Sequence, residues 1–146
     1  MTTTSDWKAQ VVAEFRANEG RVGGAFAGAP MTLVHHRGRK TGRELLAPMM
    51  YLPGDAVGAA SDTIFVFASK AGAPTHPDWY HNLVAAGTGE VEVGTERYPV
   101  TVTDLRGEQR DRIYAEQARR YPGFAEYETK TAGLRTIPVL ALTRQR

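Results

Sequence analysis

Four permanent cations lie within the seven residues Arg37–Arg43 of this chain. No aspartate or glutamate occurs between Glu19 and Glu44, so no neighbour in sequence neutralises the cluster. A glycine-bearing loop of this kind presents backbone N–H groups and side-chain cations together to a phosphate or carboxylate. Each charge-assisted hydrogen bond contributes about 1.5–3 kcal/mol, so three cations on one phosphate would hold a small anion well. The alternative is a solvated hairpin tip that is basic for solubility.

A further cation follows an apolar segment, at Lys70 in the stretch Ala68–Gly72. A strand that ends here would bring the hydroxyl of Ser69 and the ammonium of Lys70 to the edge of a site. Next to the first cluster Lys70 would lengthen the anion-binding surface, whereas alone it would be a solvent lysine. Aromatic side chains gather near the end of the chain and either wall a planar apolar pocket or pack onto the core. They are Tyr114, Tyr121, Phe124 and Tyr127.

Several common chemistries are absent from the sequence. The chain has no cysteine, which removes disulfides and thiolate chemistry, and neither a P-loop nor a dinucleotide glycine motif occurs. The serines lack the Gly-x-Ser-x-Gly context of a hydrolase. The histidines lack metal-ligand spacing, so we expect no metal site; they are His35, His36, His76 and His81. A net charge of only +2, with aromatics not interleaved with cations, argues against nucleic acid.

The elements that must position these residues follow from periodicity. Helical spacing predicts a first, amphipathic helix within residues 1–20, a short helix over 77–86, and a last helix over about 107–121 that Pro122-Gly123 ends. Alternation and β-branched content predict strands. They lie at 31–36, 44–52, 63–68, 90–93, 98–102 and 137–143. Pro48 indicates an edge or a bulge in the second strand.

About six strands joined largely by hairpins indicate the α+β class and a small antiparallel β-barrel with flanking helices. The 146 residues fit a single domain, 1–146. Side chains would fill such a barrel, so a ligand would lie in a groove on its flank or at a subunit interface.

The start of the chain has no secretory signal pattern, and no apolar run approaches the roughly 20 residues of a membrane span. We therefore expect a cytoplasmic protein. The apolar stripe of the first helix, with Trp7, Val11, Val12 and Phe15, either covers the core or touches a membrane surface at the cytoplasmic face. The sequence does not decide between these two roles.

Several short motifs occur in one order from about residue 20 to the end of the chain. They are Gly38-Arg39-Lys40-Thr41-Gly42, Pro48 with Tyr51, Ala68-Ser69-Lys70, His76–Leu83, Tyr121-Pro122 and Thr136–Val139. Together they resemble the deazaflavin-dependent nitroreductase family of actinobacteria. The resemblance implies a split β-barrel related to FMN-binding proteins, and reduced 8-hydroxy-5-deazaflavin, coenzyme F-420, as the cofactor. The phosphodiester and oligoglutamate tail of that coenzyme would give the acid-free cluster a polyanionic partner.

The resemblance also implies roles for individual residues. The phosphate and tail would be held by Arg39, Lys40, Thr41 and Gly42, with Arg37 or Arg43 compensating for Leu45, where relatives commonly have a further arginine. The ring would lie against Pro48, Met49, Met50, Ala68, Ser69 and Lys70. The acceptor pocket would be formed by Met50, Tyr121, Phe124 and Tyr127. A proton would come from water, Ser69 or Tyr121.

The function implied is hydride transfer from the reduced deazaflavin to an apolar electrophile such as a quinone, an activated alkene or a nitroaromatic. Phe124 and Met50 stand where family nitroreductases often have tyrosine, so reduction of nitroimidazoles does not follow. Two alternatives remain: an FMN-binding oxidoreductase, and a non-catalytic carrier of the deazaflavin or of an apolar ligand. Proteins of this fold are often homodimers.

Overall fold

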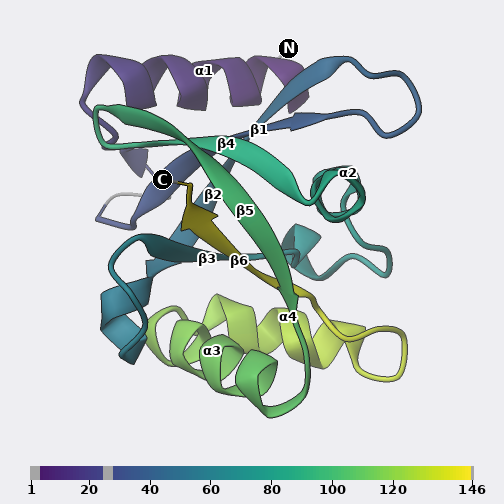
Figure 1. Cartoon of the computed structure of the whole chain (residues 1–146). Helices are drawn as coiled ribbons and strands as arrows, with labels where there is room; N and C mark the ends of the chain where they lie inside the picture. Colours follow the sequence, from purple (N-terminus) through teal and green to yellow (C-terminus); the bar gives the residue numbers. More distant parts are fainter. Residues whose placement is uncertain (1–3, 25–27, 146) are drawn as a thin grey trace.

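A closed antiparallel barrel forms the body of the protein in the computed structural model, which describes residues 4–24 and 28–145. Neighbouring strands follow the order β1-β2-β3-β6-β5-β4 around it (Figure 1). The strands are β1 (Met31–Arg37), β2 (Glu44–Pro53), β3 (Thr63–Phe67), β4 (Thr88–Val93), β5 (Glu96–Leu105) and β6 (Val139–Arg144). The α+β class and the barrel predicted from the sequence are confirmed.

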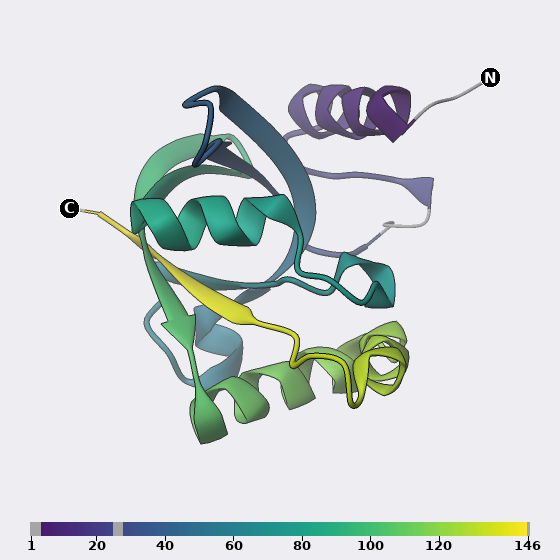
Figure 2. The same cartoon turned by 90° about the vertical axis from the view of Figure 1, so that its right-hand side faces the viewer.

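In the described ranges, the helices α1 to α4 and the short 3-10 helices η2 and η3 surround the barrel. Helix α1 lies along one side, α3 and α4 cover the opposite side, and α2 crosses one end, which faces the viewer in Figure 2. Their bounds are α1 (Thr4–Ala17), η2 (Gly54–Val57), η3 (Lys70–Gly72), α2 (Asp78–Ala86), α3 (Gly107–Arg120) and α4 (Gly123–Thr131). The molecule therefore has three layers: helix α1, the barrel, and the pair α3 and α4 (Figure 1).

Alternating side chains fill the barrel, as the period of a strand requires. Val34, Val66 and Leu140 are fully buried inside it, and Leu83 of α2 closes the end. The opposite faces of the strands carry a second cluster under α3 and α4 and a third under α1. The interior is therefore packed with side chains, and a ligand must lie outside it.

One predicted boundary is wrong. The helix at 107–121 is not the last one, because α4 begins at Gly123 immediately after it. Pro122 ends α3 as expected, but its φ of −58° and ψ of −20° also suit the start of a helix, so the same residue is the N-cap of α4. Helix α4 carries Phe124 and Tyr127.

The stripe on α1 covers a core. Val11 and Phe15 are buried against Met31 and Leu33 of β1, while the side chain of Trp7 lies outside the described residues. Nothing here supports a membrane contact through these two side chains. Among the helices of the described ranges, none has the length and apolar content needed to span a bilayer.

Candidate functional site

The basic stretch forms the loop of the β1–β2 hairpin, and its backbone is a compact turn. The N–H of Gly38 donates to the Arg43 carbonyl at 2.9 Å, and the N–H of Gly42 donates to the Gly38 carbonyl at 2.8 Å. Gly42 has a φ of +71°, which glycine adopts without strain. The turn leaves Lys40, Thr41 and Arg43 exposed to solvent.

Helix α2 holds this loop through one amide side chain. Asn82, 3% exposed, accepts the backbone N–H of Arg39 at 3.1 Å and its guanidinium Nη1 at 3.0 Å. The Asn82 amide nitrogen donates to Nδ1 of His36 at 3.0 Å, which requires that ring nitrogen to be unprotonated. Burial, reinforced by the charge of Lys8, lowers the pKa of His36 to about 4. A neutral histidine therefore orients the amide that fixes the loop.

Two cations of the loop are unused within the protein. Neither Lys40 nor Arg43 has a hydrogen-bond or ion-pair partner for its side chain among the described residues. A cavity of about 230 Å³ lies against Lys40; the hairpin loop lines it together with Asp78 and Asn82 of α2. Arg37 instead donates to the Gly42 carbonyl at 3.3 Å. At this cavity Lys40 is therefore the cation without a partner among the described residues, Arg39 lies 3.9 Å from Asp78, and Arg43 lies outside the lining.

Strand β2 leaves β3 part-way along its length. The two strands pair only from Tyr51 to Pro53 of β2. The N–H of Tyr51 donates to Pro30 on the β1 side, so by antiparallel alternation the backbone groups of Pro48 and Met50 point to the β3 side. Pro48, which lacks an N–H, is tolerated there because no ladder partner stands opposite. We call this opening, between Pro48–Met50 and Ala68–Lys70, the β2–β3 seam.

The turn after β3 has a conformation that binds anions in other proteins. Ser69 is right-handed helical (φ −74°, ψ −36°), and Lys70 and Ala71 are left-handed, with φ of +49° and +54°. A right-handed residue followed by a left-handed one makes successive N–H groups converge into a nest. Within the described chain no acceptor takes the N–H of Ser69, Lys70 or Ala71, and the Lys70 ammonium bonds Thr75 at 3.1 Å.

The structure separates two side chains that the resemblance placed together. Met50 lies on the outer face of β2 and packs between the clusters under α1 and under α3–α4, whereas Met49 packs against the interior cluster. Pro48 shares the outer face with Met50 because side chains alternate along the strand. A ring in the seam would therefore meet the side chains of Pro48 and Met50 and only the backbone of Met49.

The aromatic residues have different surroundings. Phe124 is 8% exposed and packs edge-to-face with Phe67, at 5.7 Å between ring centroids, so it belongs to the core. Tyr121 and Tyr127 are half-buried beside the same cluster as Met50. Tyr127 adjoins the turn, since a Cβ built on Gly72 would lie 3.5 Å from its Cα. Tyr121 lies outside α4, as the extended C-cap residue of α3.

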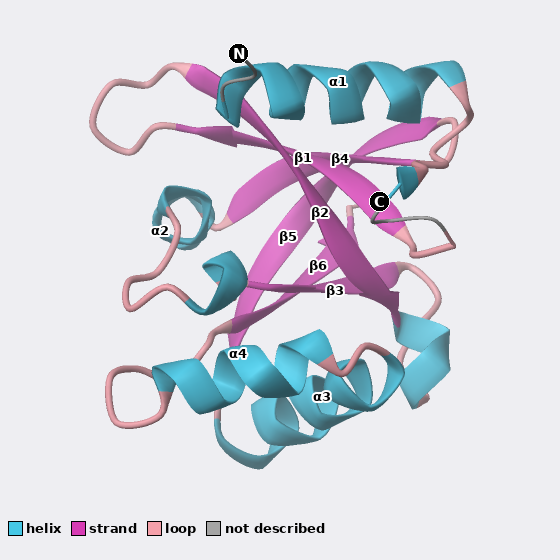
Figure 3. Ribbon diagram, turned by 180° about the vertical axis from the view of Figure 1, so that it is seen from behind, coloured by secondary structure: helices cyan, strands magenta, loops and turns pink. Residues whose placement is uncertain are grey.

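The two hydroxyls predicted to donate a proton are half-buried. In the portion of the chain described here, the side-chain oxygens of Ser69 and Tyr121 make no hydrogen bond. Ser69 lies at the β2–β3 seam, and Tyr121 is the C-cap residue of α3, just before α4. The hairpin loop, α2, η3 and the connection after α4 all lie at one end of the molecule, on the right in Figure 1 and on the left in Figure 3.

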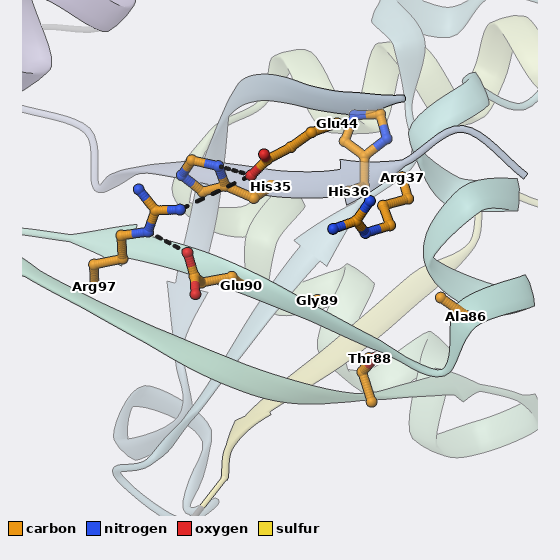
Figure 4. A pocket seen from close by; sticks show the side chains of 9 residues that line it. All are labelled: His35, His36, Arg37, Glu44, Ala86, Thr88, Gly89, Glu90 and Arg97. Carbon is orange, nitrogen blue, oxygen red and sulfur yellow. Dashed lines mark hydrogen bonds and ion pairs between the residues drawn. The ribbon is translucent and has the colours of Figure 1, made fainter. Parts of the chain in front are cut away.

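A second cavity, of about 270 Å³, has a different electrostatic character. It opens between the hairpin and the start of β4, and it is lined by Arg37, Glu44, Glu90 and Arg97 among others (Figure 4). Arg97 is paired with Glu90 and lies 3.9 Å from Glu44. Acids and bases offset each other there, so the surplus of positive charge belongs to the hairpin loop.

Three residues that support the site were not found from the sequence. His36 and Asn82 fix the hairpin loop from within the barrel end, and Arg135 bonds the turn after β3. Only the position of Asn82 within the His76–Leu83 motif could have suggested one of them. The partners of Arg135 are backbone carbonyls, which leave no trace in the sequence.

The barrel, the cations without partners among the described residues and the free N–H groups after β3 are the features of a protein that binds an anionic ligand outside its barrel. The comparison with known families makes this specific: residues 7–144 match the model of the family described as "F420H(2)-dependent quinone reductase". The chain belongs to this family. It is an oxidoreductase whose cofactor is reduced coenzyme F-420, as the sequence predicted, and the matched family is named for the quinone acceptor.

Curated relatives agree. The F420H(2)-dependent quinone reductase Rv1261c of Mycobacterium tuberculosis is 33% identical over 138 residues, which are 90% of this chain and 85% of that protein. The putative F420H(2)-dependent quinone reductase Rv3178 of the same organism is 29% identical over 123 residues, 84% of this chain and 97% of that one. The actinobacterial resemblance is thus supported by mycobacterial relatives.

Solved structures have the same fold. One described as an F420-H2 dependent reductase has a TM-score of 0.65 and 34% identity, and covers 77% of this chain and 93% of its own. Another, described as a domain-swapped dimer, has a TM-score of 0.67 and 31% identity over 96% of this chain and 99% of its own. The haem storage protein HutZ of Vibrio cholerae, at 12% identity and a TM-score of 0.57, shares the fold alone.

Proposed function

We propose that this protein binds reduced coenzyme F-420 with its anionic tail at the hairpin loop and its ring along the β2–β3 seam, and that it reduces a quinone there. The observation that carries the proposal is the pairing of two unused donor sets at one end of the barrel. Among residues 4–24 and 28–145, Lys40 and Arg43 are cations without partners, and the Ser69–Ala71 turn has N–H groups without acceptors. Both sets suit the phosphodiester and carboxylates of that coenzyme.

In this arrangement each part of the chain has a separate task. Arg39, fixed by Asn82, and Thr41 and Gly42 shape the loop that the tail crosses, while Lys40 and Arg43 supply charge. Ser69 and Lys70 with the preceding Ala68 hold the ring from β3. The Met50 N–H, which points toward β3, can donate to a polar edge of the ring.

The bound coenzyme supplies a hydride donor, and the protein determines where the acceptor lies and what protonates it. Met50 and Tyr127 form an apolar surface beside the turn, suited to a flat quinone ring, with Tyr121 at the end of α3 and Phe124 as their support. Ser69 is the nearer candidate for a proton donor because it lies at the seam. Tyr121 would serve an acceptor held nearer the junction between α3 and α4.

Titration of the purified protein with coenzyme F-420, followed by a turnover assay with a soluble quinone, tests the proposal. We expect binding tighter than millimolar and oxidation of the reduced coenzyme only when both protein and quinone are present. FMN is the matched control ligand: tight binding of FMN with none of F-420 would contradict the proposal. Coenzyme binding without turnover across quinones and nitroaromatics would make the protein a carrier.

We also propose that the protein forms a homodimer, supported by the related structure described as a domain-swapped dimer. Light scattering on the eluting protein measures the mass directly. A single species at the monomer mass of 16.0 kDa at all concentrations would contradict this.

A further inference from the structure

Arg135 lies in the connection between α4 and β6 and bonds the turn after β3. Its backbone N–H donates to the Thr131 carbonyl at 3.1 Å, which anchors it to the end of α4. Its guanidinium donates to three carbonyls of the turn: Nη1 to Ala68 at 3.0 Å, Nη2 to Ser69 at 2.9 Å and Nε to Ala73 at 3.0 Å. One side chain thus holds both ends of a six-residue segment.

The charge of Arg135 is not used for an ion pair. Among the described residues no carboxylate lies within ion-pair distance of its guanidinium, and the fourth partner is Nδ1 of His76 at 2.9 Å. Burial lowers the pKa of Arg135, although a guanidinium stays charged at every accessible pH. Carbonyls of one turn are the main compensation for removing this charge from water, so the geometry of the turn and the arginine depend on each other.

The carbonyl contacts fix the direction of the neighbouring N–H groups. The Ala68 carbonyl and the Ser69 N–H belong to one trans peptide, as do the Ser69 carbonyl and the Lys70 N–H, and in a trans peptide these groups point in opposite directions. Because both carbonyls point to Arg135, both N–H groups point away from it. On an extended β3 the N–H of Ser69 would face β2, since the N–H of Ala68 faces β6 and bonds Pro138. The two donors are therefore directed to the β2–β3 seam.

The turn also needs an external restraint. Lys70 and Ala71 both have positive φ without being glycine, which disfavours this conformation in an isolated segment. The backbone bonds of the turn itself run from Gly72 to Ser69 and from Ala73 to Lys70. Four guanidinium contacts from outside are the additional restraint that makes the strained form the stable one.

We propose that Arg135 is the positioning residue for coenzyme binding: it holds the Ser69 and Lys70 N–H groups aimed at the seam before the coenzyme arrives. This inference rests on the proposed function. It also links the two halves of the site, because Arg135 is attached to the end of α4, the helix that carries Tyr127, and Thr131 bonds the Tyr127 carbonyl at 3.0 Å. Arg135 contacts neither coenzyme nor acceptor and acts only through the turn.

The test compares Arg135→Ala with wild-type protein and with Arg119→Ala, an exposed arginine on α3 that pairs with Glu116. We expect the dissociation constant for reduced coenzyme to rise roughly 10- to 100-fold in Arg135→Ala and to stay within about twofold in Arg119→Ala. At saturating coenzyme, kcat and the KM for quinone should change by less than about threefold, because the acceptor surface is intact. Added guanidinium, but not urea, should restore part of the lost affinity in Arg135→Ala.

A second readout needs no coenzyme. In the ligand-free protein, amide NMR signals of Ser69 and Lys70 should lose their folded shifts in Arg135→Ala while those of α2 stay in place. Should Arg135→Ala not fold, Arg135→Lys takes its place, with a weaker version of both effects because a point charge replaces the planar fork. Unchanged amide shifts, or unchanged affinity, would overturn the inference. If the wild-type protein has an ordered turn but does not bind the coenzyme, the proposed function is refuted instead.

Discussion

The two anion-facing regions of this site use opposite means. The hairpin loop presents charged side chains, Lys40 and Arg43, on an exposed turn that α2 holds by the amide of Asn82 and, more weakly, by Asp78. The turn after β3 presents backbone N–H groups in a strained conformation that Arg135 holds by several bonds. Flexible cations adapt to a tail of variable shape, whereas a fixed turn defines one position for one group. We infer that the hairpin provides affinity for the tail, and that the turn provides affinity for the ring in one fixed position.

The largest expected effect concerns the hairpin and its buried histidine. The pKa of His36 is lowered from an ordinary 6.5 to about 4 by burial and then by Lys8, so the folded protein binds this proton less readily than the unfolded chain. The stability from a neutral His36 is complete above pH 6.5 and is lost as the pH falls toward 4. Linkage gives a loss of about 3 kcal/mol across this window.

Denaturant unfolding of the wild-type protein and of His36→Gln at several pH values measures this. Glutamine can accept the same amide hydrogen bond but does not titrate, so the His36→Gln stability should fall less between pH 6.5 and 4. His81→Gln is the matched control and should keep the wild-type slope. If the free energy of unfolding falls equally with pH in wild type and in His36→Gln, then the titration of His36 does not cause the loss of stability.

The second prediction compares one glycine from each region. Gly42 and Gly72 have φ of +71° and +83°, but a Cβ on Gly42 meets nothing within 4 Å, whereas one on Gly72 meets Cδ of Lys130 at 2.8 Å and Cβ at 3.3 Å. Gly42→Ala should cost about 1 kcal/mol from the left-handed backbone alone, and Gly72→Ala about 2 kcal/mol. Thermal unfolding of both variants gives the difference. Equal losses of stability in the two variants would mean that Lys130 of α4 moves aside for the added methyl group. The turn after β3 would then be no more rigid than the hairpin loop.

The third prediction uses the salt dependence of coenzyme affinity to distinguish the ionic contacts of the hairpin loop from the backbone contacts of the turn. Lys40→Ala should weaken coenzyme binding about tenfold at low salt, and the loss should shrink as salt rises, because the contact is ionic and exposed. Ser69→Ala removes a hydroxyl but keeps the N–H, so any loss there should be small and independent of salt. Titrations at three salt concentrations decide between them. A salt-independent loss in Lys40→Ala would move the tail away from the hairpin.

The hairpin was the more predictable region from sequence. Its cations are contiguous, and the absence of acids around Arg37–Arg43 is itself a sequence signal. The strands around it, and the opening at Pro48, follow from alternation and from the missing proline N–H. The turn was only half predictable: Ser69 and Lys70 stood out, but Arg135 is 66 residues from Ser69 and its partners are carbonyls that every residue possesses.

The core beneath the turn was predictable in kind but not in detail. The aromatic residues at 114, 121, 124 and 127 were expected either to wall a pocket or to pack onto the core, and the resemblance gave all but Tyr114 to the acceptor pocket. Helix α4 was not expected, because Pro122 both ends one helix and begins the next. The division of labour among the aromatics, with Phe124 in the core and Tyr127 beside the turn, depends on how α4 lies on β3. Spacing along the chain does not contain that information.

The smallest expected effect is on stability, at Gln117 in the helix pair α3 and α4 that packs beneath the turn after β3. Gln117 of α3 is fully buried, and neither amide atom finds a partner among the described residues. It shares a helix face with Tyr114 and Tyr121, in the aromatic cluster on which the turn rests. An unpaired buried amide is destabilising, whereas an apolar side chain of the same shape is not. Gln117→Met should therefore stabilise the fold by about 1 kcal/mol, a rise of about 4 °C in Tm.

Gln109→Met, on the exposed side of α3, is the matched control and should leave Tm unchanged. Quinone turnover should be the same in Gln117→Met as in wild type, since stiffening the scaffold leaves the donors of the turn and the cations of the hairpin in place. A fall in stability would mean that the amide bonds an ordered water. A Gln117→Met variant as stable as wild type but with a raised KM for quinone would instead make Gln117 a polar contact for the acceptor. The acceptor site would then extend from Tyr121 to Gln117 of α3.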